Sequence, residues 1–158
     1  MQKQNQQDLS GLWKIRLDPK KKGILQNYQK ERWQQKQESE QGTLILPGIL
    51  QAQGYGDPIG LDTPWVSSLH DSMWYLREEY QGAQENEVNV PFLSQPPRHY
   101  LGWAWYQREI ELSEEGQYQL YLECTHWKTT VWVDGEEKGS ILSLCSPHSY
   151  FLGNIKKG

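Results

Sequence analysis

Carboxylate groups are the first candidates for chemistry in this sequence. Glu109 and Glu111 alternate along a predicted strand and would share one of its faces. Two carboxyl groups about 5 Å apart can act as nucleophile and acid/base in cleaving a glycosidic bond. We favour a solvent-facing row on an antiparallel sheet, which explains the same spacing without catalysis. The adjacent pairs lie in turns or at strand ends, where neighbours point to opposite faces: Glu78-Glu79, Glu114-Glu115 and Glu136-Glu137. We therefore assign no catalytic residue.

The histidines do not form a metal-binding motif. No close partner at ligand spacing accompanies any of the four, His70, His99, His126 and His148. The sequence also lacks a Gly-rich phosphate loop and a Gly-x-Ser-x-Gly nucleophile turn. We therefore expect neither a metal site nor a cofactor.

Aromatic side chains make the one positive case for binding. The chain has eight Trp and nine Tyr against two Phe, and such amphipathic rings both pack sheets and stack on ligands. Trp65 and Trp74 lie in predicted loops, where two interpretations stay open: an exposed platform for the C–H face of a sugar, and packing of the loop itself. We expect core packing for the tryptophans on strand patterns, which are Trp13, Trp103, Trp105 and Trp132.

Length and charge limit the class of protein. A chain of 158 residues fits one domain with its own core. Its net charge of −4 argues against a nucleic-acid partner, and no apolar run approaches the roughly 20 residues of a membrane span. Residues 1–8 are expected to be a polar, disordered start, and we expect no signal peptide there. Cys124 is expected to be a buried free thiol on the apolar side of a strand, and it shares no disulfide spacing pattern with Cys145.

Residues 102–133 contain three alternating runs in close succession, the pattern of half-buried antiparallel strands. The first run extends to Ile110, and in the second Tyr118, Leu120 and Leu122 face away from the residues between them. Asp134-Gly135 then predicts a hairpin, because a type I′ turn needs positive φ at both central residues. The stretch predicts an all-β, antiparallel fold.

The remaining elements are shorter. Strands are predicted at residues 10–17 and 42–46, the second stopped by Pro47-Gly48. At 24–36 we favour a short helix over an irregular connection. The section 49–98 is dense in turn residues, with strand candidates only at 73–80 and 88–92. A section of this kind is often functional in a compact domain.

Several of these segments resemble one known family. They read GWAWYQRE at 102–109, VWVDGEEKG at 131–139, SLCSPHSY at 143–150, LSGLWKI at 9–15 and LPG at 46–48. These strings, taken in their order along the chain, are similar to the amino-terminal sugar-binding domain of family 2 glycoside hydrolases, which include β-galactosidases, β-glucuronidases and β-mannosidases. The resemblance extends from about residue 9 to 152. It implies a jelly-roll β-sandwich over 9–158, of the galactose-binding type.

The resemblance also implies a function. The domain would be non-catalytic, supporting the catalytic barrel of an enzyme that hydrolyses β-linked glycans. In the family, the loop before the Trp-Tyr strand reaches towards the active site; here that loop is 91–101, with Gln95, Arg98, His99 and Tyr100. Together with Trp65 and Trp74 these are the candidate carbohydrate contacts. The family's catalytic glutamates lie in the barrel and have no match here.

The resemblance further implies partners and a location. The chain is expected to end in a turn over 151–158, before the family's last strands, its immunoglobulin-like domain and its barrel. Unpaired sheet edges would then favour a homodimer. Family members suggest a periplasmic or secreted protein. Two alternatives stay open: an autonomous carbohydrate-binding module, and a purely structural packing domain.

Overall fold

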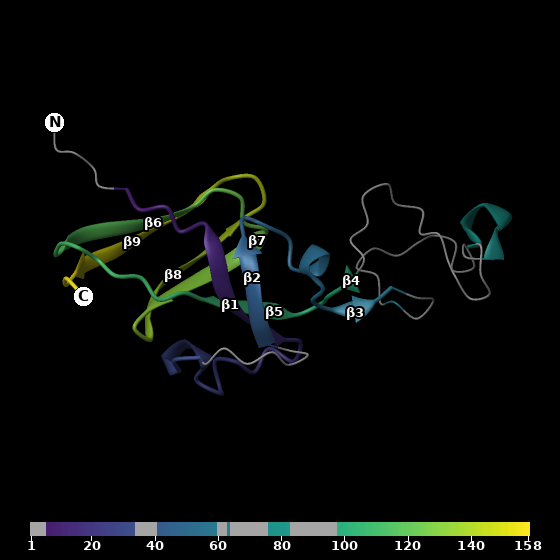
Figure 1. Cartoon of the computed structure of the whole chain (residues 1–158), viewed down its shortest axis with the longest axis horizontal. Helices are drawn as coiled ribbons and strands as arrows, with labels where there is room; N and C mark the ends of the chain where they lie inside the picture. Colours follow the sequence, from purple (N-terminus) through teal and green to yellow (C-terminus); the bar gives the residue numbers. More distant parts are fainter. Residues whose placement is uncertain (1–5, 34–40, 60–62, 64–75, 83–97) are drawn as a thin grey trace. The chain divides into compact units, whose positions relative to one another are not determined.

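The computed structural model describes residues 6–33, 41–59, 63, 76–82 and 98–158 (Figure 1). Within these ranges the secondary structure is antiparallel β with short 3-10 helices, and no α-helix or closed barrel occurs. The all-β, antiparallel prediction is thereby confirmed. The chain forms two compact units, Met1–Pro19 with Gln35–Tyr106, and Lys20–Gln34 with Gln107–Gly158.

The core of the first unit lies on a three-stranded sheet ordered β2-β1-β5, formed by β1 (Gly11–Asp18), β2 (Gln41–Leu46) and β5 (Trp103–Gln107). β1 and β2 are antiparallel, with Ile15 opposite Gly42. Alternate side chains point inward, so Ile15, Leu17 and Leu44 form the buried cluster. Burial of each contributes about 1.5–3 kcal/mol. Both strands predicted near the start of the chain are confirmed.

The outer edge of β2 is closed by side chains. Gln53, which ends the 3-10 helix η2 (Gln51–Gln53), accepts the Ile45 N–H at 2.7 Å and donates to the Ile45 carbonyl at 2.9 Å. Tyr55 donates to the Thr43 carbonyl at 2.8 Å. Backbone groups that would template a further strand therefore already have partners.

Two further short elements belong to the middle section of the chain. β3 (Asp57–Pro58) pairs antiparallel with β4 (Arg98–His99). Residues 78–80 form the 3-10 helix η4 (Glu78–Tyr80), so the strand predicted at 73–80 is wrong over its described end. The strand candidate at 88–92 lies outside the described residues.

The second unit consists of two nested antiparallel pairs. β6 (Gly116–Leu122) pairs with β9 (His148–Ile155), and between them in the sequence β7 (Trp127–Val133) pairs with β8 (Glu136–Ser143). The burial of β6 alternates as its sequence pattern predicts. Asp134 and Gly135 have φ of 50° and 81°, and Val133 is opposite Glu136, which confirms the two-residue hairpin.

The helix predicted at 24–36 is wrong over its described part. The segment forms turns and one 3-10 helix, η1 (Tyr28–Lys30), and residues 34–36 lie outside the described ranges. Asn27 has φ of 58°, in the left-handed region, which a right-handed helix cannot continue through.

Three further predictions are corrected near the strand ends. β5 ends at Gln107, so the predicted strand does not extend to Ile110. β6 ends at Leu122, which leaves Cys124 in the connection beyond it, exposed rather than buried; Cys145 is exposed too. Residues 151–155 continue β9 instead of forming a turn, and Leu112 and Gly158 then exchange backbone hydrogen bonds.

The tryptophans predicted for the core divide by their place on the strands. Trp105, inside β5, is buried as predicted, while Trp13 and Trp132 are half-buried. Trp103 is exposed, so its core prediction is wrong: it is the first residue of β5, at the end of the ladder.

Replacing Gln53 tests whether its amide protects the edge of β2. Gln53→Ala leaves both backbone groups of Ile45 without their side-chain partner, and we expect a loss of about 1 kcal/mol in unfolding free energy. We also expect stronger self-association than the wild type shows at equal concentration. Urea unfolding and sedimentation measure the two effects, with exposed Gln26→Ala as the control. Equal behaviour of the two variants would contradict the edge role.

The Tyr55 hydroxyl makes stability depend on alkaline pH. Burial raises the pKa of the Tyr55 phenol above 10.0. Because the folded pKa exceeds the unfolded one, its contribution is complete below about pH 10 and is lost as the pH rises through the folded pKa. We expect the urea midpoint to fall less steeply above this pH in Tyr55→Phe than in the wild type. Parallel slopes for the two proteins would rule out this origin.

Candidate functional site

Three of the six predicted sugar contacts lie in the described chain. Arg98 and His99 form β4, and Tyr100 follows it directly; all three side chains are half-buried. Trp65, Trp74 and Gln95 lie outside the described residues, as does the loop from 91 to 97. The candidate site is therefore built from the end of this loop, residues 98–102.

Tyr100 fixes the loop end to the sheet of the first unit. Its hydroxyl accepts the Asp18 N–H at 2.8 Å, where β1 ends, and donates to the Trp103 carbonyl at 2.6 Å, where β5 begins. One phenol thus satisfies a donor and an acceptor on two different strands. We call this arrangement of Tyr100, Asp18 and Trp103 the Tyr100 clasp. Tyr100 remains a predicted sugar contact, but its hydroxyl is already engaged by the backbone, which leaves its ring for stacking.

Asp18 adds a buried polar contact beside this clasp. The residue is 5% exposed, and its Oδ2 accepts the indole N–H of Trp105 at 3.1 Å. A buried carboxylate is stable only where hydrogen bonds replace water. Trp105 therefore both fills the interior and holds a polar group, a role that the strand pattern alone does not reveal.

Two glycines let backbone segments approach closely around β4. At Gly56, a Cβ would lie 2.5 Å from the His99 carbonyl oxygen. At Gly102, with φ of 149°, it would lie 2.7 Å from both the Pro19 Cα and the Tyr100 hydroxyl. Arg98 completes the contact by donating from Nη1 to the Gly56 carbonyl at 3.2 Å. The two predicted contacts in β4 are thus presented from a closely packed support.

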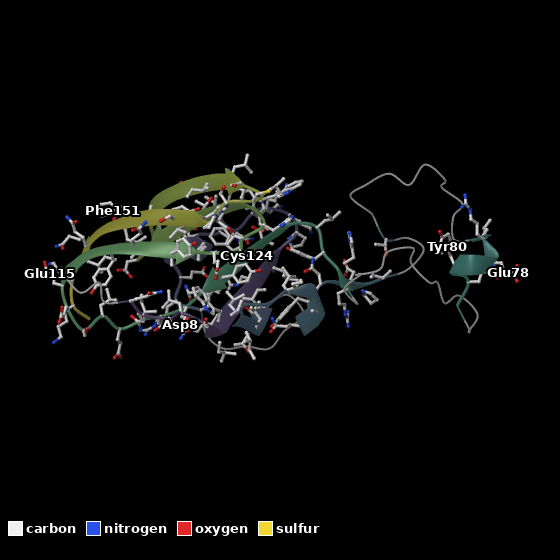
Figure 2. All side chains as sticks on the ribbon, turned by 90° about the horizontal axis from the view of Figure 1, so that it is seen from above. Asp8, Glu78, Tyr80, Glu115, Cys124 and Phe151 are labelled. Carbon is white, nitrogen blue, oxygen red and sulfur yellow. The ribbon has the colours of Figure 1, made fainter. Side chains whose placement is uncertain are left out.

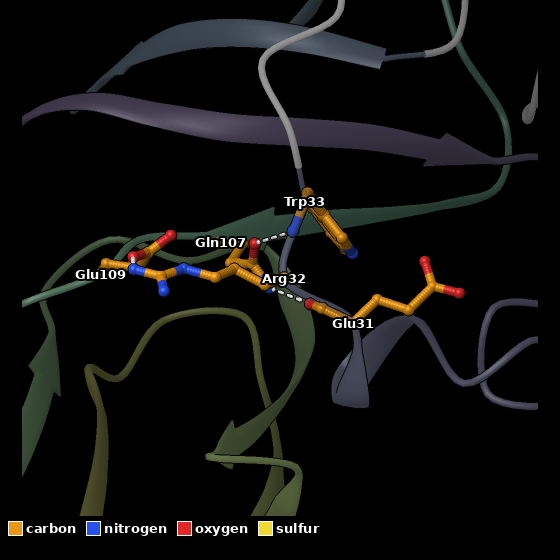
Figure 3. A network of polar contacts seen from close by, with 5 residues as sticks. All are labelled: Glu31, Arg32, Trp33, Gln107 and Glu109. Atoms are coloured by element: carbon orange, nitrogen blue, oxygen red, sulfur yellow. Dashed lines mark hydrogen bonds and ion pairs between the residues drawn. The ribbon is translucent and has the colours of Figure 1, made fainter.

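A glutamine in the second unit holds a distant segment by its backbone (Figure 3). The Gln107 side chain accepts the Trp33 N–H at 2.9 Å and donates to the Glu31 carbonyl at 2.7 Å. Trp33 is buried, and its indole donates to the Tyr28 carbonyl. Gln107 therefore takes the place of a paired strand for residues 31–33.

Glu109 is drawn in the same view, and its contact bears on the predicted carboxylate row. Its carboxylate forms an exposed ion pair with Arg32, and this interaction raises the pKa of the guanidinium. Glu109 and Glu111 are both exposed, and neither lies in a strand. The solvent-facing interpretation of these two glutamates agrees with this exposure.

A buried histidine connects β7 to β9. The fully buried His148 contacts Thr129 Oγ1 through Nδ1 at 2.5 Å and the Ser143 carbonyl through Nε2 at 3.3 Å. Because a carbonyl only accepts, Nε2 carries the proton. Tyr150 donates to the Thr129 carbonyl at 2.9 Å. This network ties two strands together, and the Pro-His-Ser-Tyr string was its only signal in the sequence.

No group of three or more His, Cys, Asp or Glu gathers in a metal-binding arrangement within the described ranges. Nor does any helix in this part of the chain have the length and apolar character needed to span a membrane. We therefore assign no metal ligands.

The comparisons with known proteins add no family. No protein-family model matches the chain, and no curated protein matches its sequence.

Tyr100→Phe tests the clasp. The variant removes the partner of the Asp18 N–H and of the Trp103 carbonyl, and we expect a loss of about 1–3 kcal/mol in unfolding free energy. Tyr118→Phe is the matched control, since its hydroxyl serves only the exposed Glu114 carbonyl. Denaturant unfolding measures both variants. A loss in Tyr100→Phe no larger than in the control would show that the clasp is dispensable.

Proposed function

We propose that this chain is the non-catalytic sugar-binding domain of a family 2 glycoside hydrolase. It would support the catalytic barrel and lend the end of its 91–101 loop to the substrate pocket. The observation that carries the proposal is the hairpin over residues 131–139. The VWVDGEEKG string that resembles the family folds as a two-residue β-hairpin, with both turn residues at positive φ.

The pairing in the second unit supports the jelly-roll part of the proposal. A jelly roll is a long antiparallel ribbon folded over on itself, so its strand pairs nest in the sequence. β6–β9 enclose β7–β8, and the connections on both sides are four residues long, 123–126 and 144–147. Because both strands of the ribbon are interrupted over the same length, the ribbon can fold over at this point.

The loop end supports the pocket part of the proposal. Arg98 and His99 are held in β4 by pairing with β3 and by the Tyr100 clasp. A guanidinium and an imidazole carry several N–H donors suited to sugar hydroxyls. Side chains held on rigid backbone orient a ligand more precisely than those on a free loop.

The proposed division of labour assigns the chemistry to the barrel. There, a double displacement would use one glutamate as nucleophile and a second as acid, then base. Glu109 of this chain forms an exposed ion pair with Arg32, unlike the sheltered carboxyl pair that acid/base catalysis needs. The proposed substrates are β-linked glycans, and the proposed location is periplasmic or secreted.

A reconstitution experiment tests the proposal. The full chain is added to a family 2 β-glycosidase from which the amino-terminal domain has been removed, and hydrolysis of nitrophenyl β-glycosides is measured. We expect the chain to hydrolyse none alone, but to bind the truncated enzyme and raise its activity. Activity of the chain alone, or no effect on the truncated enzyme, would contradict the proposal.

The same assay tests the loop. Arg98→Ala and His99→Ala are expected to raise KM about tenfold and to leave kcat within about twofold, as for groups that bind ground state and transition state alike. Lys128→Ala, an exposed cation on β7, is the control and should change neither constant. Unchanged KM in both loop variants would remove the loop from the pocket.

A further inference from the structure

The outward face of the β6–β9 pair carries an unusual set of side chains. Gln117 lies opposite Asn154, Gln119 opposite Phe151, and Tyr121 opposite Ser149. All six side chains are exposed. An irregularity in β9 near Gly153 keeps Asn154 on the same face as Phe151. The six form one continuous surface, which we call the amide–aromatic face.

Two rings dominate this face. Tyr121 is 61% exposed and Phe151 is 65% exposed, and Phe151 lies on β9 in Figure 2. In the ladder they are diagonal neighbours, for which the spacing is about 7–8 Å. Their strand neighbours Leu120 and Tyr150 point to the inner face, where Tyr150 is buried. The alternation of the strands therefore holds both rings outward.

The polar members of the face are all neutral. Gln119 donates to Ser149 Oγ and Asn154 donates to Glu115 at 2.9 Å, which positions two of the amides. An amide offers two N–H donors and a carbonyl acceptor, so each retains further hydrogen-bonding groups after one such bond. None of the six positions carries a charged side chain, although 23% of the whole chain is charged.

We propose that the amide–aromatic face binds a neutral, linear polysaccharide. The C–H faces of adjacent sugar units would stack on Tyr121 and Phe151, while Gln117, Gln119 and Asn154 bond the equatorial hydroxyls. Rings with apolar faces flanked by neutral donors and acceptors match a ligand that has both properties and no charge.

Charges beyond the face disfavour an anionic glycan. Glu115 precedes β6 and Glu123 follows it, so carboxylates lie at both ends of this strand. Lys156 and Lys157 follow β9 at the same end as Glu115 and offset only that end. A chain of uronic acids would meet Glu123 without a matching cation on the described strands of this pair.

This site goes beyond the proposed function and does not rest on it. It lies in the second unit, whereas the 98–102 loop end belongs to the first. The reconstitution experiment can fail while the glycan site stands, and the reverse also holds.

Calorimetric titration of the full chain tests the site. The probes are neutral β-1,4-linked hexaoses of glucose, mannose, xylose and galactose, with polygalacturonate as the anionic comparison. We expect at least one neutral hexaose to bind in the millimolar range or tighter, and polygalacturonate to bind more weakly. Tyr121→Ala and Phe151→Ala should each weaken binding roughly 10- to 100-fold, as expected for losing one buried ring.

Three variants separate stacking from other causes. Phe151→Leu keeps an apolar side chain but removes the ring, so it should weaken the sugar complex like the alanine variant, whereas Phe151→Tyr should keep it. Leu142→Ala, which alters an exposed apolar residue on β8, should leave the Kd unchanged. Circular dichroism verifies that each variant is folded.

Three results would overturn the proposal. The first is no binding of any neutral hexaose below about 10 mM. The second is a Kd unaffected by both alanine variants, or retained in Phe151→Leu. The third is self-association of the wild type that Phe151→Ala abolishes without any sugar binding, which would make the face an interface between two copies.

Discussion

The need of every backbone N–H and C=O for a partner explains more of this structure than any other constraint. In the described chain the sheets have two or three strands, so a large share of backbone groups lies at edges and turns. Side chains satisfy several of these backbone groups in place of a neighbouring strand. Gln53 pairs with Ile45 and Gln107 with residues 31–33, each amide supplying one donor and one acceptor as a strand would. The glutamine-rich composition thus has a structural use.

The two units both consist of small sheets, but they present different surfaces. In the first, the Tyr100 clasp and two close backbone approaches hold the short strand that contains Arg98 and His99. In the second, a nested ribbon buries His148 and Tyr150 on its inner side and leaves neutral amides and two rings on its outer side. A loop end suits recognition within a pocket, whereas a flat face suits an extended chain. The two proposed functions, as an accessory domain and in glycan binding, can therefore coexist in one protein.

The predictable part of the fold is the part encoded locally. Period-two alternation identified β6 and β7, and Asp134-Gly135 identified the hairpin, because half-burial and positive φ act on neighbouring residues. The clasp escaped prediction since Tyr100 and Asp18 are 82 positions apart, and Gln107 bonds Trp33 across 74. The helix error had a local cause that the pattern hides, namely the left-handed backbone at Asn27. The amide–aromatic face was not predicted, because half of it lies on β9, where a turn was expected over residues 151–158.

The nesting of β7–β8 within β6–β9 has a consequence for the order in which the second unit assembles. The hairpin closes over two residues, so its contacts form at small entropic cost and on the microsecond scale typical of hairpins. Pairing Leu122 with His148 in an unstructured chain would instead close a long loop. Once Trp127 is paired with Ser143, only four residues on each side separate the two strand ends. We therefore expect the β7–β8 hairpin to form first and the β6–β9 pair to form after it.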